Sequence, residues 1–280
     1  RARKTRKTLI EAKKMIIAPK FVLINFPKTG TTFVRTALNA VHGVNNSRLH
    51  RVLRKLNIEK PIARELLLPK LYGDYDASCK DQHGVYRQIP KPKKYKKIVT
   101  IIRNPLARYM SSYVFGWWKQ HPPFPLEQVK LDFPDFPNLS FLDFYRLLNH
   151  PLVNEDKINI SGARQYGNYT RMFLVFYSEN PEDAVKNLLK GKTLMSVIPK
   201  ITFLHQESLR DELYGFLKTV GYSELEAQRV YSIEDQNVGS ATEKDAISKD
   251  ELREVAQLIL SDEMPLLEAF PRYYEYLLEF

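Results

Sequence analysis

The sequence predicts an α/β fold in which helices flank a mainly parallel sheet. Short apolar segments at residues 21–26 and 96–102 have the composition of buried strands, and a helical pattern follows each of them. Strands that alternate with helices in this way form parallel sheets covered by helices. At 280 residues and 44% hydrophobic content, the chain is long enough to bury one large core. We expect a single domain over residues 15–280 with long inserted loops, preceded by a basic extension over residues 1–14.

The first predicted strand leads into a segment suited to phosphate. Residues 27–32 read P-K-T-G-T-T, and a helical pattern begins directly after them. A strand, a tight glycine turn and a helix amino terminus together form a phosphate cradle, although a plain turn is the alternative for this segment taken alone. In a Walker A loop the lysine follows the second glycine. Here Lys28 precedes Gly30, the single glycine of the segment, so an ordinary ATP or GTP site is disfavoured.

The second predicted strand also leads into a segment suited to phosphate. Arg103 stands where this strand ends, and Pro105 fits the first turn of a helix on which Ser111 lies two turns further along. An arginine at a strand end and a hydroxyl on the adjacent helix can both face one phosphate, and the planar guanidinium suits that group. Considered alone, Arg103 could equally cap a helix or pair with a surface acid.

Together the two segments resemble the sulfotransferase family that uses 3′-phosphoadenosine-5′-phosphosulfate (PAPS). In that family the phosphosulfate loop looks like P-K-[ST]-G-T-T, and the 3′-phosphate segment looks like R-[ND]-P-x-x-R-x-x-S-x-Y. The resemblance covers roughly residues 20–115 and weakens towards the C-terminus. It implies a P-loop-like, three-layer α/β/α fold. It also implies that PAPS is bound by the following residues: Lys28, Thr29, Gly30, Thr31, Thr32, Arg103 and Ser111.

The reaction implied by the resemblance moves a sulfuryl group from PAPS to a hydroxyl or amine of a carbohydrate, lipid or small-molecule acceptor. The product of the donor is 3′-phosphoadenosine-5′-phosphate (PAP). The turn brings Lys28 near the bridging oxygen, where negative charge builds as the sulfuryl group leaves, and a fixed ammonium stabilises that charge. The step parallels in-line phosphoryl transfer. No metal is expected, because the protein itself supplies positive groups at the site.

The acceptor must lose a proton during transfer, so a general base is expected, and histidine is the most common choice. In the resembling family a base histidine commonly lies on the segment that feeds the second strand. His83 has that position and is the predicted base, with Asp81 as the next alternative. His42 and His50 are weaker candidates, and His121 could line an acceptor pocket instead.

The net charge of +11 is unevenly distributed along the chain. Residues 201–280 carry 7 basic and 17 acidic side chains, so the excess of positive charge lies in the part that holds both predicted phosphate segments. A positive field there would attract a polyanionic cofactor, and could also attract nucleic acid or an acidic membrane surface. No nucleic-acid partner is expected, because no known recognition motif accompanies the charge.

The sequence also indicates the cellular compartment in which the protein works. No apolar run reaches the roughly 18 residues needed to span a bilayer, and no signal-peptide pattern is present. Cys79 is the single cysteine, so the chain can form no internal disulfide, which fits a reducing compartment. We expect a cytoplasmic enzyme without a membrane span. Because the chain begins at Arg1, a lumenal domain with a trimmed membrane anchor is the alternative.

Two other classes of function stay open. A P-loop kinase-like phosphotransferase would need magnesium and a Walker-type loop, and the loop here has the wrong order of residues. A non-enzymatic basic module that binds polyanions would show steeply salt-dependent affinity and no preference for a 3′-phosphate.

Further elements are predicted around the two phosphate segments. Residues 117–140 are rich in proline and aromatic residues, which excludes a long helix and suits a loop that lines an acceptor site. Ser248 and Glu251 form a capping box that starts a late helix. Helical patterns cover residues 62–68, 141–148, 181–189 and 209–220, and strand-like patterns cover residues 172–177 and 201–204.

The polar loop at residues 235–244 resembles the N-x-S loop that closes over the cofactor in carbohydrate-type sulfotransferases. That branch is the closer likeness, because the basic, glycine-rich segment of the cytosolic branch is not found here. The resemblance implies cofactor contacts from Asn237, Ser240 and Lys244, with Gly239 as a departure from the pattern.

Overall fold

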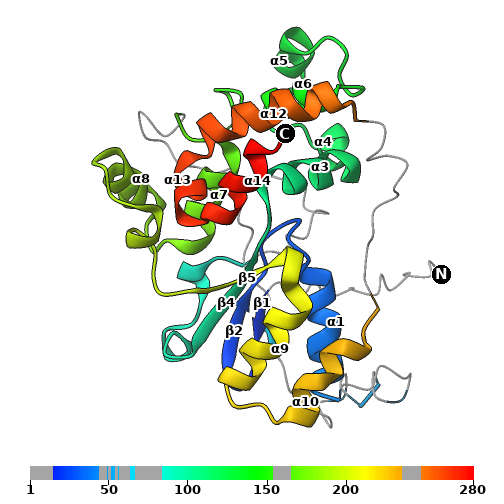
Figure 1. Cartoon of the computed structure of the whole chain (residues 1–280), viewed down its shortest axis with the longest axis vertical. Helices are drawn as coiled ribbons and strands as arrows, with labels where there is room; N and C mark the ends of the chain where they lie inside the picture. The colour runs from blue at the N-terminus through cyan, green and yellow to red at the C-terminus, as the bar shows by residue number, and fades with distance from the viewer. Residues whose placement is uncertain are drawn as a thin grey trace, which may run out of the picture.

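A five-stranded sheet forms the centre of the lower half of the molecule as drawn in Figure 1. The computed structural model describes residues 15–43, 49, 52–53, 56, 64–66, 84–153, 165–234 and 247–280. The strand order is β3-β1-β2-β4-β5. The strands are β1 (Met15–Ile17), β2 (Phe21–Ile24), β3 (Arg64–Leu66), β4 (Lys97–Ile102) and β5 (Thr202–His205).

The sheet is mostly parallel. Strand β4 pairs in parallel with β2 on one side and with β5 on the other. Strand β1 runs antiparallel to both β2 and β3, so the other four strands share one direction. The predicted α/β class with a mainly parallel sheet is therefore confirmed. The carboxyl ends of β2, β4 and β5 meet at one edge of the sheet, where ligands bind in folds of this kind.

Helices cover both faces of the sheet. Successive residues of a strand point to opposite faces, so one strand contributes side chains to the apolar cores on both sides. On β2, Phe21 and Leu23 join one apolar core, whereas Val22 and Ile24 join the other. The first core contains residues of α1 (Thr31–Val41), α9 (Leu209–Thr219) and α10 (Glu224–Gln228). The second contains residues of α7 (Asn168–Tyr177), and the Thr100 hydroxyl meets that of Tyr177 at 2.9 Å.

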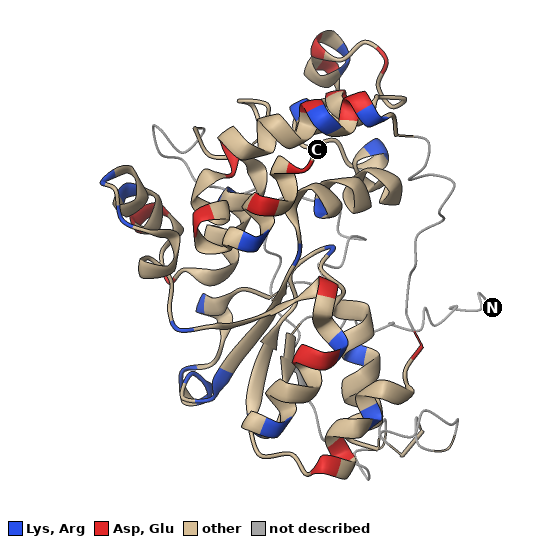
Figure 2. Cartoon of the chain, viewed as in Figure 1, with Lys and Arg blue, Asp and Glu red and all other residues tan. Residues whose placement is uncertain are grey.

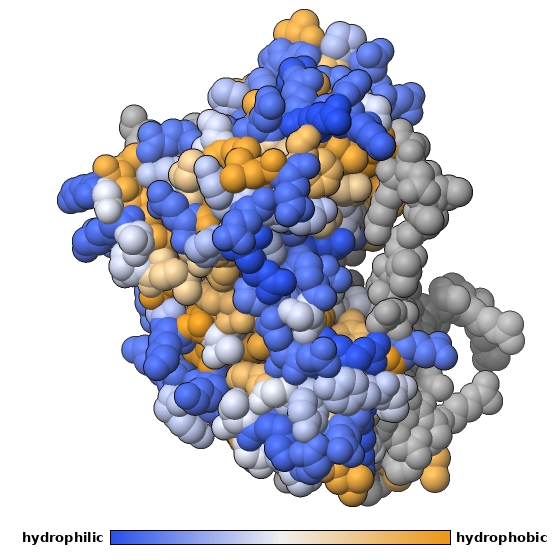
Figure 3. All heavy atoms as spheres, viewed as in Figure 1, coloured by the Kyte–Doolittle hydropathy of each residue, from blue (hydrophilic) through white to orange (hydrophobic). Residues whose placement is uncertain are grey.

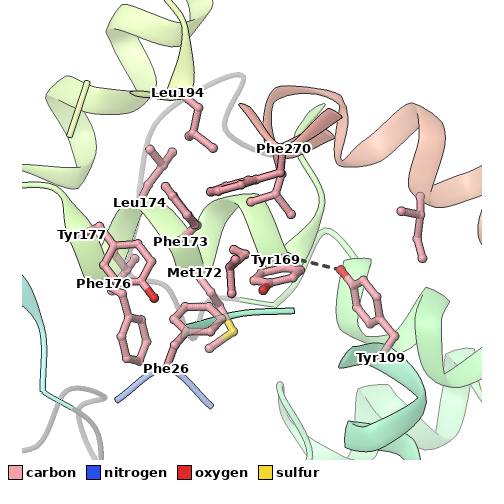
Figure 4. Close-up of a cluster of buried hydrophobic side chains, with 14 of the residues drawn as sticks. Phe26, Tyr109, Tyr169, Met172, Phe173, Leu174, Phe176, Tyr177, Leu194 and Phe270 are labelled. Atoms are coloured by element: carbon pink, nitrogen blue, oxygen red, sulfur yellow. Dashed lines mark hydrogen bonds between the residues drawn. The ribbon is translucent and has the colours of Figure 1, made fainter. Parts of the chain in front are cut away.

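The second core extends from the sheet into the upper, helical part of the molecule (Figure 1). Its aromatic centre includes Phe26, Tyr169 and Phe270, which come from three distant parts of the chain (Figure 4). The described residues of this part also form the following helices: α3 (Pro105–Phe115), α4 (Trp117–Gln120), α5 (Leu126–Asp132), α6 (Phe141–Asn149), α8 (Pro181–Leu189), α12 (Lys249–Asp262), α13 (Met264–Ala269) and α14 (Pro271–Leu278).

Most of the predicted elements are present where the structure describes them. Helices α6, α8, α9 and α12 stand where helical patterns were predicted, and Ser248 and Glu251 form the predicted capping box at the start of α12. The predicted strand at residues 201–204 is β5. The proline-rich segment 117–140 contains only the short helices α4 and α5, in agreement with the prediction that a long helix is excluded.

Two predictions of secondary structure are wrong. The segment at residues 172–177 was predicted as a strand and is the second half of α7, which is buried along its whole length and so has no polar face to reveal a helical period. The helix predicted at residues 62–68 is also wrong, because Arg64–Leu66 forms β3 by pairing with β1. Tertiary pairing outweighs local preference in such a short segment.

The described part of the chain contains no helix long and apolar enough to cross a membrane. Basic residues lie on the β4 side of the sheet as well as near its carboxyl edge (Figure 2). The face shown in Figure 3 is mostly hydrophilic, and hydrophobic residues reach the surface between the polar ones.

Candidate functional site

The segment after β2 forms a tight turn with an unusual backbone. Lys28 has a φ of 66° and Gly30 a φ of 92°, and Lys28 is the one non-glycine residue with positive φ in the described part of the chain. The left-handed region is strained for residues with a Cβ, and such strain is concentrated at functional sites. The buried Thr29 hydroxyl donates to the carbonyl oxygen of Phe26 at 3.0 Å, which holds the turn closed.

The turn delivers the chain into α1, whose amino terminus is open to an anion. No side chain of the described residues caps α1, and the first turn of the helix contains no acidic residue. The first hydrogen bond of the helix runs from the Val34 N–H to the Gly30 carbonyl, so the N–H groups of Thr31, Thr32 and Phe33 lie ahead of it. Free N–H groups and the positive end of the helix dipole favour a negatively charged ligand.

The amino termini of α3 and α9, which also begin at this edge of the sheet, already have partners or acidic side chains within the protein. Helix α3 is capped by Asn104, whose side chain accepts from the Ala107 N–H at 3.2 Å. Helix α9 has Asp211 and Glu212 in its first turn. Of the three helices α1, α3 and α9, α1 is therefore the one whose amino terminus suits an external anion.

Gly30 is required by space as well as by φ. A Cβ at this position would lie 3.1 Å from the Leu209 side chain and 3.2 Å from that of Gln206, both beyond β5. We expect Gly30→Ala to lower the free energy of unfolding by about 1–3 kcal/mol, through backbone strain and crowding, and to weaken anion binding. Urea denaturation measures the first effect.

The matched control for Gly30→Ala is Gly215→Ala. Gly215 lies inside α9, where an added Cβ would meet nothing within 4 Å. This substitution should raise the free energy of unfolding by about 0.5–1 kcal/mol, because alanine is the better helix former. Equal effects of the two substitutions would contradict the importance of the Gly30 turn.

The two predicted phosphate segments meet at Arg103. Its guanidinium Nη1 donates to the carbonyl oxygen of Lys28 at 3.1 Å, so the end of β4 is joined directly to the turn after β2. Arg103 Nε is buried and has no hydrogen-bond partner among the described residues. A buried donor without a partner is costly, and an anion bound beside it would satisfy it.

Tyr169, on α7, holds the main chain of Arg103. Its hydroxyl lies 3.3 Å from the Arg103 N–H and 3.2 Å from the Arg103 carbonyl oxygen, so it can accept from one and donate to the other. Its ring is stacked on Phe26 at 5.3 Å, and its main-chain N–H donates to the Tyr109 hydroxyl (Figure 4). Tyr169 thus touches both segments, and nothing in the sequence pointed to it.

Glu207 occupies the amino end of α3. Its Oε1 accepts from the Asn104 N–H at 2.8 Å, and its Oε2 accepts from the Tyr273 hydroxyl at 3.0 Å. The backbone at the start of α3 is thus bound to a carboxylate of the protein. A phosphate near β4 would consequently depend on the Arg103 side chain rather than on the α3 dipole. Sequence reasoning also missed Glu207.

Lys28 reaches from the turn towards the far end of α3. Its Nζ lies 3.9 Å from the centre of the Phe115 ring. Burial, together with the positive charges of Arg103 and Arg108, lowers the pKa of Lys28 to about 8. The ammonium is thus still largely protonated at neutral pH, but it is destabilised, and a bound anion would restore its pKa.

Ser111 lies on α3, half-buried, between Arg108 and Phe115. Residues three and four positions apart share a helix face, so Ser111 faces the side over which Lys28 extends. Among the described residues no hydrogen bond joins Ser111 to Arg103, which forms its bonds with Lys28 and Tyr169. The two predicted 3′-phosphate ligands therefore lie on neighbouring elements, and no hydrogen bond between them is found among the described residues.

Arg108 is a further cation of the site. It is 3% exposed, and its guanidinium carbon lies 4.3 Å from the Tyr169 ring and 5.1 Å from the Phe26 ring. Within the part of the chain that the structure describes, the Arg108 Nε has no hydrogen-bond partner. Arg108 therefore adds positive charge beneath the turn, and it is shielded from solvent. Its place in the second motif was visible in the sequence, but its burial was not.

The candidate bases fall into two groups. His83, Asp81 and His50 lie outside the described residues, as do the predicted cofactor contacts Asn237, Ser240 and Lys244. His42 is buried against Tyr222, with His42 Nε2 2.8 Å from its hydroxyl, and burial lowers the pKa of His42. His121 stacks on the exposed ring of Trp117, with ring centres 3.8 Å apart.

A surface hollow lies away from this edge, between α5, α6 and α12. It has a volume of about 490 Å³, and its lining includes His150 and Asp262 but no residue of the turn or of β4. No group of three or more metal-ligating side chains occurs in the described segments. The carboxyl edge of the sheet is therefore the candidate site. No family model, curated protein or solved structure matches the chain.

Proposed function

We propose that the protein is a sulfotransferase that transfers a sulfuryl group from PAPS to a hydroxyl or amine of an acceptor. The observation that carries the proposal is the hydrogen bond from Arg103 to the Lys28 carbonyl. It brings the two segments that resemble the PAPS-binding motifs to one edge of the sheet. A donor with two anionic ends needs two such sites close together.

The described residues fit such a donor. The uncapped start of α1, with Thr31 and Thr32, would hold the 5′-phosphosulfate through N–H groups and hydroxyls. Arg103, whose Nε has no partner in the described segments, would hold the 3′-phosphate from the neighbouring strand end, with Ser111 on the adjoining helix. When bound, the donor supplies the sulfuryl group.

Lys28 has the properties that the reaction needs. Its ammonium would lie at the bridging oxygen and stabilise the negative charge that develops when the S–O bond to the 5′-phosphate breaks. The new S–O bond forms to the acceptor oxygen, and the proton of that oxygen passes to the base, for which His83 is our candidate. The turn fixes the lysine before the reaction, so little reorganisation is needed during the step.

The observations favour this proposal over the two alternatives. A P-loop kinase-like enzyme would carry its lysine after the glycine pair of the loop, whereas Lys28 stands two residues before Gly30. A module that binds polyanions through surface charge would not need buried arginines, and Arg108 is almost completely buried.

Calorimetry with PAP and with AMP tests the proposal. We expect PAP to bind and AMP to bind much more weakly, because AMP lacks the 3′-phosphate. Arg103→Lys should weaken PAP binding roughly tenfold to hundredfold, since it removes the planar donors of a charged hydrogen bond, and should weaken AMP binding much less, through loss of the bond to the Lys28 carbonyl alone. Arg146→Lys, on the exposed side of α6, is the matched control and should change neither affinity.

Two results would overturn the proposed function. One is the absence of PAP binding at high micromolar concentration. The other is equal affinity for PAP and AMP, which would indicate a general phosphate site or a polyanion-binding surface.

A further inference from the structure

We propose that residues 91–97, which we call the lysine loop, dock the protein on a bilayer surface that contains acidic phospholipids. The loop reads K-P-K-K-Y-K-K and ends where β4 begins, at Lys97. It contains five lysines within seven residues. It takes no part in the proposed transfer reaction, whose described residues lie around the carboxyl ends of the strands.

A series of turns folds the lysine loop into a compact projection. The main-chain N–H groups of Lys93, Lys94 and Lys96 each donate to the carbonyl oxygen three residues earlier, at 2.7, 3.2 and 3.1 Å. Pro90 and Pro92 restrict the backbone further. In Figure 1 the segment lies in the lower half of the molecule, on the β4 side of the sheet. The positions of the lysines are therefore fixed before a partner binds.

Two of the five lysines fasten the loop to the rest of the protein. The Lys94 ammonium forms an ion pair with the Glu179 carboxylate at 2.6 Å. The Lys96 ammonium donates to the carbonyl oxygens of Ala18 and Pro19, at 2.7 Å in both cases. These two side chains stabilise the fold of the loop, so they are not the ones to alter in a test of docking.

The other three lysines, Lys91, Lys93 and Lys97, have no hydrogen bond or ion pair from their side chains within the described segments. Lys91 and Lys97 are exposed, and Lys93 is half-buried. Partial burial, together with the charge of Lys93, lowers the pKa of Lys96, which shows how closely the like charges are held. No acidic residue occurs from residue 84 to residue 126. Such a cluster attracts a surface that carries many negative charges.

Tyr95 distinguishes a bilayer from other polyanions. It lies among the lysines and is 79% exposed, more than any other large hydrophobic side chain of the described residues. Tyrosine is favoured at the membrane interface, where its ring contacts apolar groups while its hydroxyl stays in water. Tight binding to a nucleic-acid duplex takes many phosphate contacts spread along the duplex, whereas these charges are gathered in one short projection. The combination of lysines with an exposed ring therefore favours a bilayer.

Strand β4 separates the lysine loop from the candidate site. The amino ends of β2, β4 and β5 share one edge of the sheet, because these strands are parallel. A strand of six residues spans about 20 Å, so a surface that contacts Lys97 lies about that far from Arg103. Docking through the loop would leave the carboxyl edge facing away from the bilayer, so docking and PAP binding should not affect each other.

The test is sedimentation of the full chain with vesicles of phosphatidylcholine that contain about one third phosphatidylserine. We expect binding to these vesicles and almost none to vesicles of phosphatidylcholine alone. Replacing Lys91, Lys93 and Lys97 together by glutamine should weaken binding about hundredfold, because each lysine near an acidic membrane contributes a factor of roughly five. Added salt should weaken the binding of the unaltered protein, since the charges are exposed to solvent.

The matched control removes the same net charge elsewhere. Replacing Lys119, Lys130 and Lys249 by glutamine alters exposed lysines of α4, α5 and α12, and should change vesicle affinity less than about twofold. Tyr95→Ala should weaken binding about threefold to fivefold, and Tyr95→Trp should retain it and shift the tryptophan emission to the blue. Thermal denaturation of each variant shows whether the fold is kept.

Three outcomes would overturn docking through the lysine loop. The first is equal vesicle affinity of the two triple variants, and the second is equal binding to vesicles without phosphatidylserine. The third is loss of binding to a short DNA duplex in the lysine-loop variant while its vesicle binding is unchanged, which would assign the loop to nucleic acid. PAP affinity, measured in the same variants, should stay constant. Docking can therefore fail while PAP still binds, and vesicle binding without PAP binding would contradict the proposed function alone.

Discussion

Replacing Lys28 with methionine is expected to lower kcat for sulfuryl transfer by about 10²–10³-fold, the usual cost of removing one preorganised group that stabilises developing charge. Methionine keeps the length of the side chain and its place over the Phe115 ring, and removes only the charge. PAP affinity should fall by less than tenfold, because the α1 amino terminus and Arg103 remain. Release of labelled sulfate from PAPS in single turnovers, with water as the acceptor, measures the effect.

The same lysine should control the dependence on pH. The pKa of Lys28 is lowered to about 8, and the protonated form is the one that stabilises the leaving oxygen. The value of kcat/KM, which reports the free enzyme, should therefore decline as pH rises through about 8. Bound anions favour the ammonium, so the corresponding decline in kcat should occur at higher pH. In Lys28→Met this decline at high pH should disappear.

The control for this experiment is Lys130→Met, at an exposed lysine of α5. It should leave both the rate and the pH profile unchanged. A rate for Lys28→Met within threefold of the unaltered protein would contradict the role proposed for the ammonium, and an unchanged high-pH decline would assign that decline to another group.

Replacing Glu263 with alanine is expected to lower the free energy of unfolding by about 3–5 kcal/mol. Glu263 is completely buried at the end of α12. Its carboxylate accepts from the Tyr109 hydroxyl at 2.6 Å, from the N–H groups of Tyr169 and Thr170 at 2.8 and 2.7 Å, and from the Thr170 hydroxyl at 2.6 Å. Alanine would leave these buried donors without an acceptor, which costs more than the absence of the bonds alone.

Thermal and urea denaturation measure this loss, and the melting temperature should fall by roughly 10 °C for a protein of this size. Glu268→Ala is the matched control, since Glu268 is an exposed carboxylate on α13. It should change the free energy of unfolding by less than about 0.5 kcal/mol. A loss below about 1 kcal/mol for Glu263→Ala would mean that water or other acceptors replace the carboxylate.

The parts of the site that the sequence predicts are those fixed by local chemistry. Gly30 determines the turn, Asn104 and Pro105 start a helix, and Arg103 marks the end of a strand, so both phosphate segments could be located from a few adjacent residues. Their meeting could be anticipated as well, because the carboxyl ends of parallel strands lie on one edge of a sheet.

The residues that hold the site in place through tertiary contacts could not be found from local sequence patterns. The Tyr169 hydroxyl acts on a residue 66 positions away, Glu207 on one 103 positions away and Glu263 on one 154 positions away. Such pairs are created by tertiary packing and leave no spacing in the sequence. Helix α7 was misassigned for a related reason: a fully buried helix lacks the alternation between polar and apolar faces on which a sequence-based assignment depends.

The bond from Tyr273 to Glu207 has a practical consequence for anyone who shortens the chain. Tyr273 belongs to α14, more than 60 residues beyond the carboxylate that it holds. A truncated version that ends before Pro271 would leave Glu207 with a free oxygen close to Arg103, where the two opposite charges attract each other. That carboxylate would then compete with an incoming phosphate. The truncation would also remove Tyr273 and Leu277 from the apolar core, so an expression design has to keep the final helix.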